Sequence, residues 1–163
     1  MKINDLIESS SKTRKGQQGA IFSSLFIIGN KLQTVFDNHI SELSLKQYML
    51  LSLMEQSKEK LTFTQLGNLL GCSRQNIKKL SNVLEKKGFV NIEQNPNDSR
   101  AFCLCLTEKA KEYLSIDFMK YRDELKYLFE EYSDDEIKVL FELLMRLYNG
   151  VESLEKKVCD EKI

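Results

Sequence analysis

Apolar residues recur along most of the chain at intervals of three and four, which is the spacing of one face of an α-helix. The pattern predicts helices over residues 17–39 and 45–56, two short helices between 62 and 87, and long helices between 108 and 158. Only residues 89–94 and 102–106 have the composition of strands, and turn-forming residues separate them. The expected fold class is mainly α with one small β-hairpin.

Helix-boundary residues mark the segment 61–107 as two short helices across a tight turn, followed by the hairpin. Thr62 and Gln65 have the spacing of a capping box, in which each side chain binds a backbone N–H of the other residue. Gly71 suits the position just past a helix end, where φ is positive, Ser73 suits the cap of the next helix, and Gly88 ends that helix. The candidate core residues are Leu45, Met49, Leu53 and Met54 before this segment and Leu66, Leu69, Leu70, Ile77, Leu80 and Leu84 within it.

The second short helix presents a polar and basic set of side chains. Its exposed candidates are Arg74, Gln75, Asn76, Lys78 and Lys79, with Lys86 and Lys87 further along. In the major groove of DNA, arginine pairs with guanine, and asparagine or glutamine with adenine. A helix-turn-helix presents the start of its second helix to those base edges. A solvated basic face on ordinary helices is the alternative, but the spacing, the amides and the hairpin together favour DNA binding.

Apolar stripes at both ends of the chain exceed what a small helical core needs. The helix over 17–39 is apolar on two faces, so we expect it to be buried on two faces. The last helix carries heptad-like apolar residues, namely Ile137, Phe141, Leu144, Tyr148 and Val151. A monomeric helical core is the alternative, and the length of the stripes favours a dimer.

Four segments of the sequence resemble the MarR family of winged helix-turn-helix transcriptional regulators. They are Ser73-Arg74-Gln75-Asn76, Leu84-Glu85-Lys86-Lys87-Gly88-Phe89-Val90, Asp98-Ser99-Arg100 and Leu104-Cys105-Leu106-Thr107-Glu108-Lys109-Ala110. The resemblance extends over nearly the whole chain and implies one MarR-type domain, residues 1–163. It implies a winged helix-turn-helix over about 44–107 and dimerisation helices over about 17–40 and 108–158.

The resemblance also implies a function and a set of DNA-binding residues. It implies a homodimer that binds double-stranded DNA at an inverted repeat and regulates transcription, with repression favoured and a small molecule or an oxidant as effector. The implied DNA-binding residues are Ser73, Arg74, Gln75, Asn76, Lys78, Lys79, Asp98 and Arg100. The wing departs from the family pattern, because Asn97 stands where a first arginine is common. We therefore expect a less basic wing, in which Asp98 holds the guanidinium of Arg100.

The charges are balanced overall but unevenly distributed. The chain has 24 Lys and Arg and 24 Asp and Glu residues. Residues 1–107 hold 14 basic and 9 acidic residues, whereas residues 108–163 hold 10 basic and 15 acidic. A basic half that binds nucleic acid and an acidic tail account for this asymmetry. The sequence has no apolar run long enough for a membrane helix and no signal peptide's apolar core, so we expect a cytoplasmic protein with reduced cysteines and no membrane partner.

The cysteines and the single histidine are the remaining candidates for chemistry. Cys103 and Cys105 lie two apart in a strand and are either a metal or disulfide pair or small buried hydrophobes, and we favour the latter. With His39 the sole histidine and no Cys-x-x-Cys, we expect no metal and no cofactor. Cys72 lies at a helix N-terminus near Arg74, two features that lower the pKa of a thiol, so we expect mild oxidant sensitivity. His39 lines either a ligand pocket or the dimer interface, and we favour the interface.

Catalysis finds little support. The sequence has no phosphate-binding Gly-rich loop, no nucleophile elbow and no metal-binding histidine pair. We therefore expect a dimeric DNA-binding regulator and not an enzyme. The runner-up is a redox or ligand sensor whose winged helix binds protein, and a thiol enzyme is the weakest hypothesis.

Overall fold

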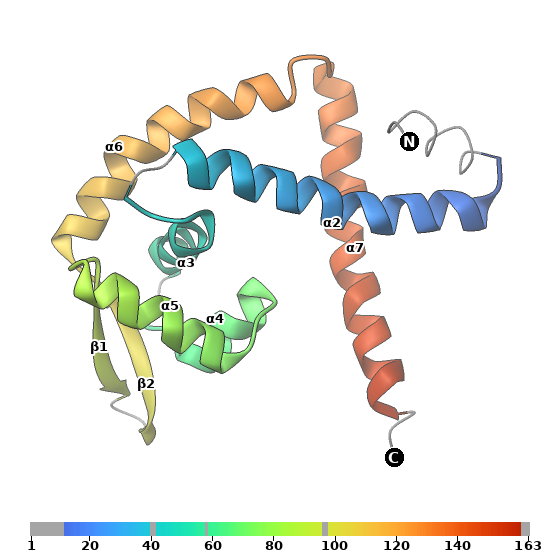
Figure 1. Ribbon diagram of the computed structural model, residues 1–163. Coiled ribbons are helices and arrows are strands. Elements are labelled where there is room, and N and C mark those ends of the chain that lie inside the picture. Colours follow the sequence, from blue (N-terminus) through green and yellow to red (C-terminus); the bar gives the residue numbers. More distant parts are fainter. Residues whose placement is uncertain (1–11, 40–41, 58, 96–97, 161–163) are drawn as a thin grey trace. The chain divides into compact units, whose positions relative to one another are not determined.

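The computed structural model describes residues 12–39, 42–57, 59–95 and 98–160, and Figure 1 labels their elements. They belong to two compact units, Met1–Leu114 and Ser115–Ile163, whose boundary falls within α6. The elements are α2 (Arg14–His39), α3 (Leu45–Gln56), α4 (Phe63–Leu70), α5 (Arg74–Lys86), β1 (Val90–Asn95), β2 (Asp98–Leu106), α6 (Glu108–Leu125), a short 3-10 turn (Lys126–Leu128) and α7 (Asp134–Asp160). The mainly helical fold with one antiparallel hairpin confirms the predicted class.

Side-chain caps start the helices where the sequence indicated. At α4 the Gln65 N–H donates to Thr62 Oγ1 at 3.3 Å, and the Thr62 N–H donates to Gln65 Oε1 at 2.9 Å, which confirms the capping box. An equivalent box formed by Ser44 and Gln47 starts α3. At α5 the Asn76 N–H donates to Ser73 Oγ at 3.2 Å. These bonds satisfy N–H groups that have no partner inside a helix.

Two glycines end α4 and α5 in the same way. Gly71 has φ 64° and Gly88 has φ 77°, the left-handed conformation that glycine adopts without steric cost. After α5 the Phe89 N–H donates to the carbonyl of Leu84 at 2.9 Å, and the Gly88 N–H donates to that of Glu85 at 2.9 Å. This is the Schellman pattern of a helix C-terminus, and α4 repeats it after Gly71. Both predicted helix ends are confirmed.

The hairpin pairs β1 with β2 in register from Val90 opposite Leu106 to Gln94 opposite Phe102, with an irregularity between Gln94 and Asn95. Pro96 and Asn97 of the predicted turn lie outside the described residues. Just before α4, Thr62 forms an isolated antiparallel bridge with Cys103 of β2.

The core of the first unit lies between α3, α4, α5, the hairpin and the start of α6. Its most completely buried large side chains are Leu50, Leu51, Leu66, Ile77, Leu84, Phe89 and Val90. Two core predictions are wrong, since Met49 is 41% exposed and Leu69 is 57% exposed. Apolar residues occur all around α3 and at successive positions of α4, so their spacing did not single out the inward face. Phe63, which the apolar spacing did not indicate as a core residue, is buried instead.

The helices α2 and α7 are apolar but contain no buried residue in the single chain. Ser133 directly precedes the N-terminus of α7, and its N–H donates to Glu136 Oε2 at 2.9 Å. This bond and one from the Ser133 hydroxyl hold the pKa of Glu136 below its usual value. In the described part of the chain, no helix is long and apolar enough to cross a membrane.

Candidate nucleic-acid interface

The start of α5 places one face of side chains in solvent and the opposite face in the core. Arg74, Gln75, Asn76, Lys78 and Lys79 are all exposed, together with the cap residue Ser73. Ile77, Ser81 and Leu84 are buried on the other side, and the Ser81 hydroxyl donates to the carbonyl of Ile77 at 2.7 Å. One face of α5 therefore packs into the core, and the predicted basic and amide residues share the opposite, solvent-exposed face.

The turn between α4 and α5 is closely packed. A Cβ atom on Gly67 would lie 2.7 Å from the backbone carbonyl oxygen of Cys72, closer than side chains tolerate. Gly67 therefore lets the turn that carries Cys72 approach α4, and this approach sets the direction in which α5 leaves the turn.

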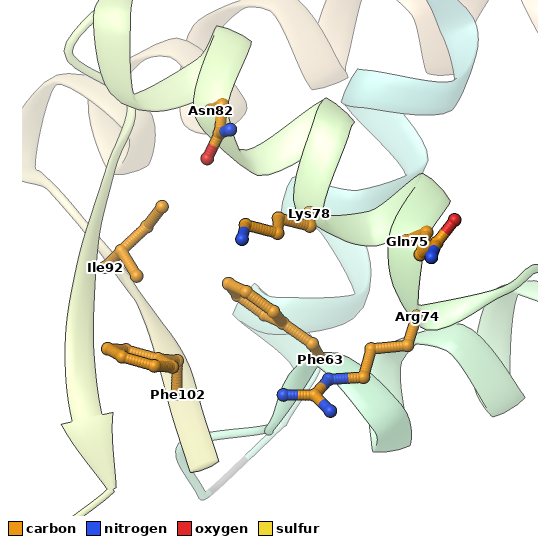
Figure 2. A pocket seen from close by; sticks show the side chains of 7 residues that line it. All are labelled: Phe63, Arg74, Gln75, Lys78, Asn82, Ile92 and Phe102. Carbon is orange, nitrogen blue, oxygen red and sulfur yellow. The ribbon is translucent and has the colours of Figure 1, made fainter. Parts of the chain in front are cut away.

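A cavity of about 410 Å³ lies between α5 and the hairpin (Figure 2). Its lining residues are Phe63, Arg74, Gln75, Lys78, Asn82, Ile92 and Phe102. The rings of Phe63 and Phe102 stack with centroids 6.5 Å apart and an interplanar angle of 25°. Two cations from α5 thus stand beside an apolar wall from α4 and the hairpin. No pattern in the sequence indicates this wall, because Phe63 and Phe102 are 39 positions apart.

A second cavity, of about 330 Å³, adjoins the first on the side of the wing. Phe63, Arg74 and Phe102 line both cavities, and the second adds Asn95, Asp98 and Arg100 of the hairpin among its lining residues. The structure therefore brings the predicted wing residues Asp98 and Arg100 to the same surface as Arg74. Asp98 Oδ1 accepts the backbone N–H of Arg100 at 2.9 Å, so this bond holds the strand, whereas we expected Asp98 to hold the guanidinium.

Lys87 is occupied in a contact within the protein, at the far end of α5. Its Nζ donates to the backbone carbonyl of Glu42 at 2.5 Å. Lys109 Nζ lies 2.9 Å from Glu42 Oε1, donates to the carbonyl of Lys87 at 3.0 Å, and lies 4.2 Å from the centre of the Phe89 ring. These contacts join the end of α5 to the residues before α3 and to the start of α6. They set Lys87 apart from Lys78 and Lys79.

The two hairpin cysteines have different environments. Cys103 is 2% exposed and packs as a small hydrophobe. Cys105 is half-buried, and its thiol donates to Glu93 Oε2 at 3.2 Å. Burial, followed by the bond to Glu93, raises the pKa of the Cys105 thiol. Lys60 Nζ also binds Glu93 Oε2, at 2.6 Å, and that bond lowers the pKa of Glu93.

The other chemical candidates remain predictions. Cys72 is half-buried in the turn before α5, next to the predicted reading residues. His39 is the last residue of α2 and is exposed in the single chain. No cluster of three or more His, Cys, Asp or Glu side chains in the described residues could hold a metal ion.

Comparison with known proteins agrees with this geometry. Residues 43–102 match the family model described as MarR family. The chain is 28% identical over 107 residues to the transcriptional repressor MprA of Escherichia coli K12, a match that covers 66% of this chain. The matched part spans only about three fifths of that repressor, 61% of its length.

Solved structures share the fold. A MarR protein from Peptoclostridium difficile superposes with a TM-score of 0.76 at 22% identity, covering 85% of this chain and 91% of the other. The Staphylococcus aureus MepR protein, solved as a complex with DNA, superposes with a TM-score of 0.70 at 17% identity, covering 80% and 97%. Residues 43–102, which hold α3, α4, α5 and β1, thus match the MarR family, and the chain shares the fold of solved MarR proteins.

Proposed function

We propose that this protein is a cytoplasmic transcriptional regulator that binds double-stranded DNA as a homodimer and represses transcription. The observation that carries the proposal is the exposed start of α5, where amide and cationic side chains share one face beside the hairpin. The match of residues 43–102 to the MarR family adds support, and so do a relative that is a transcriptional repressor and a protein of the same fold that was solved with DNA. Transcriptional regulators are not enzymes, so the proposal contains no catalytic step.

Within this proposal the exposed residues have distinct roles. Gln75 and Asn76 bind base edges in a major groove, where their amides can pair with adenine. Lys78 and Lys79 bind phosphates, which position the helix without reading sequence. The hairpin brings Arg100 to the adjacent minor groove, where arginine responds to groove width and A·T content. Ser73 caps α5 and leaves the helix N-terminus facing the DNA.

The exposed apolar residues of α2 and α7 support the homodimer. Phe22 and Phe26 of α2 are each 63% exposed, and Phe141 and Tyr148 of α7 are 60% and 65% exposed. On each of the two helices, exposed apolar surface of this kind marks a site of association. Two copies related by a twofold axis would present two α5 helices to an inverted repeat.

A small molecule or an oxidant controls DNA binding in this proposal. Cys72 supports the oxidant, because the thiol lies in the turn directly before Ser73 and Arg74. Oxidation adds polar atoms to a half-buried side chain in that turn and would shift the start of α5. A Cys72→Ser variant tests this, since it should keep DNA binding after a peroxide treatment that reduces binding by the wild type. Equal loss in both proteins would remove Cys72 as the switch.

Selection of binding sites from random DNA tests the roles of the side chains. Gln75→Ala and Asn76→Ala should each relax preference at one position in each half-site, because a bidentate amide–adenine pair contributes about 1–3 kcal/mol of discrimination. Arg100→Ala should weaken binding broadly and flatten any A·T preference outside the half-sites. Gln56→Ala, which removes an exposed amide from α3, is the matched control and should behave as the wild type.

Two outcomes would overturn this assignment. If Arg100→Ala changes a single major-groove position while Gln75→Ala and Asn76→Ala leave specificity untouched, the roles of helix and wing are wrong. If the wild type enriches no DNA at all, the DNA-binding proposal fails, and a winged helix that binds protein becomes the better account.

A further inference from the structure

The two cavities beside α5 form one continuous surface, which we call the α5–wing cleft. Its members are the residues that line either cavity, and Phe63, Arg74 and Phe102 belong to both. The cleft thus extends from Lys78 and Asn82 on α5, past Arg74, to Arg100 on the hairpin. Figure 2 shows the part beside α5, with Phe63 and Phe102 on one side and Lys78 above them.

The proposed binding mode determines which part of the DNA lies against this cleft. A sugar–phosphate strand separates each major groove from the adjacent minor groove. A protein with α5 in one groove and its hairpin in the next must therefore let that strand pass between them. We propose that the α5–wing cleft holds this strand, with Arg74 and Lys78 on phosphates, Phe102 against deoxyribose, and Arg100 where the strand borders the minor groove. This inference rests on the proposed function and adds the residues that hold one DNA strand.

The charges in the cleft fit a polyanion. Arg74 and Lys78 are four residues apart on α5 and therefore neighbours on one helix face, and Arg100 continues the series on the hairpin. Asp98 is the single carboxylate among the residues that line the two cavities, and its Oδ1 already accepts the Arg100 N–H. Three cations thus oppose one carboxylate along the path of the strand.

The apolar wall fits a sugar better than it fits a phosphate. Phe102 is 43% exposed and stacks on Phe63, which is 4% exposed, so a supported ring faces the cleft. Ile92 extends the apolar surface on β1. A deoxyribose offers C–H groups that can pack on such a ring, whereas a phosphate would lose its hydration there without a hydrogen bond in return.

Arg74 takes a different role in this arrangement from the guanine contact that its position in the sequence suggests. Its side chain extends from the start of α5 toward Phe63 (Figure 2), whereas Gln75 lines only the cavity beside α5 and not the one beside the hairpin. Arg74 also lines both cavities, at the place where they meet. It therefore holds the strand, and the reading of bases is left to Gln75 and Asn76.

Fluorescence anisotropy over a salt series tests this assignment. The probes are a duplex that the wild type recovers from random DNA and an unrelated duplex of the same length. Arg74→Ala and Lys78→Ala should each reduce the slope of log affinity against log salt by about 0.9, the value for one lost phosphate contact. Both should keep the wild-type base preference. A changed preference at one base position with an unchanged slope would overturn the role of Arg74.

Phe102→Ala should act differently from the two cation variants. It should weaken binding to both duplexes by roughly fivefold with the salt slope unchanged, because apolar contact area is lost without a charge. Leu69→Ala is the matched control, since Leu69 is an exposed apolar side chain of α4 outside the cleft. Equal affinities of Phe102→Ala and wild type, with matching circular dichroism spectra, would overturn the sugar contact.

Neutral phosphates in the DNA test the inference with the wild-type protein, so no variant has to fold. Single methylphosphonates are placed along each strand of the recovered duplex. Affinity should fall where one strand passes from each half-site's major groove to the flanking minor groove. An even loss along both strands would overturn the cleft as the path of the strand. A wild type that binds no duplex would instead overturn the proposed function.

Discussion

The apolar residues of the winged helix, which extends from α3 to β2, are far more buried than those of α7. In the winged helix Leu50, Leu51, Leu66, Ile77, Leu84 and Phe89 are all 0% exposed. In α7 none of the 27 residues is buried, although Phe141, Leu144, Tyr148 and Val151 form an apolar stripe along it. The first region therefore completes its own core within one chain, whereas the second offers apolar surface for association. One sequence thus contains a self-sufficient binding unit and helices whose burial depends on another surface.

The largest expected effect comes from a charge in the α7 stripe. Leu144→Glu should convert a dimer of about twice the 19.0 kDa chain mass into a monomer, as measured by sedimentation equilibrium at micromolar concentration. It should also weaken binding to an inverted repeat by roughly a hundredfold or more, because the second half-site no longer adds to affinity.

Glu142→Arg is the control for that variant. Glu142 lies on the same helix but outside the apolar stripe, so an inserted charge there should leave the dimer intact. If the wild type sediments as a monomer, the exposed stripe does not form a dimer and the contrast with the winged helix needs another explanation.

A smaller effect is expected from a cavity inside the winged helix. Leu84→Ala removes a side chain that is 0% exposed and should lower the free energy of unfolding by about 2–5 kcal/mol. Leu69→Ala makes the same chemical change at a side chain that is 57% exposed and should cost far less. Urea unfolding of both variants measures the difference. Equal costs would mean that the burial described for α4 and α5 is wrong.

The next largest effect on stability is expected at the turn between α4 and α5. Gly67→Ala places a Cβ 2.7 Å from the carbonyl oxygen of Cys72, and such overpacking typically costs about 1–3 kcal/mol. Gly150→Ala is the control, because a Cβ on this α7 residue meets nothing within 4 Å. There the substitution should raise stability by about 0.4–1 kcal/mol, since alanine is less flexible in the unfolded chain. Thermal unfolding should therefore shift in opposite directions for the two variants.

The smallest effect concerns thiol reactivity in the hairpin. Because burial and the bond to Glu93 raise the pKa of Cys105, less of its thiol is ionised at neutral pH and alkylation should be slow. The rate should continue to rise with pH beyond the range of an ordinary thiol. Peptide mapping after iodoacetamide treatment at several pH values measures this, with the exposed Cys159 as the comparison. Faster labelling of Cys105 than of Cys159 at neutral pH would contradict the assignment.

The sequence predicted the local features of the fold, and its failures concern packing between distant segments. The caps at Thr62 and Ser73 and the glycine ends at Gly71 and Gly88 depend on bonds within a few residues, so residue type and spacing were sufficient. The inward face of α3 and the exposure of Leu69 depend on neighbouring elements, and both predictions were partly wrong.

In the candidate site, too, the local features could be predicted from the sequence and the contacts between distant segments could not. The exposed face of α5 could be predicted, because helical spacing separates Arg74, Gln75 and Lys78 from the buried Ile77 and Leu84. The apolar wall of the α5–wing cleft could not be predicted. Phe102 comes from a strand and stacks on Phe63 from α4, and no pattern within either segment indicates that contact.

Selection of the wild-type protein against random DNA tests the central claim most directly, because it requires both the reading helix and the dimer. The enriched sites should form an inverted repeat whose half-sites are separated, centre to centre, by about 10 base pairs or a multiple of that turn length. Enrichment of a single half-site would contradict the dimer, and no enrichment would contradict DNA binding through α5.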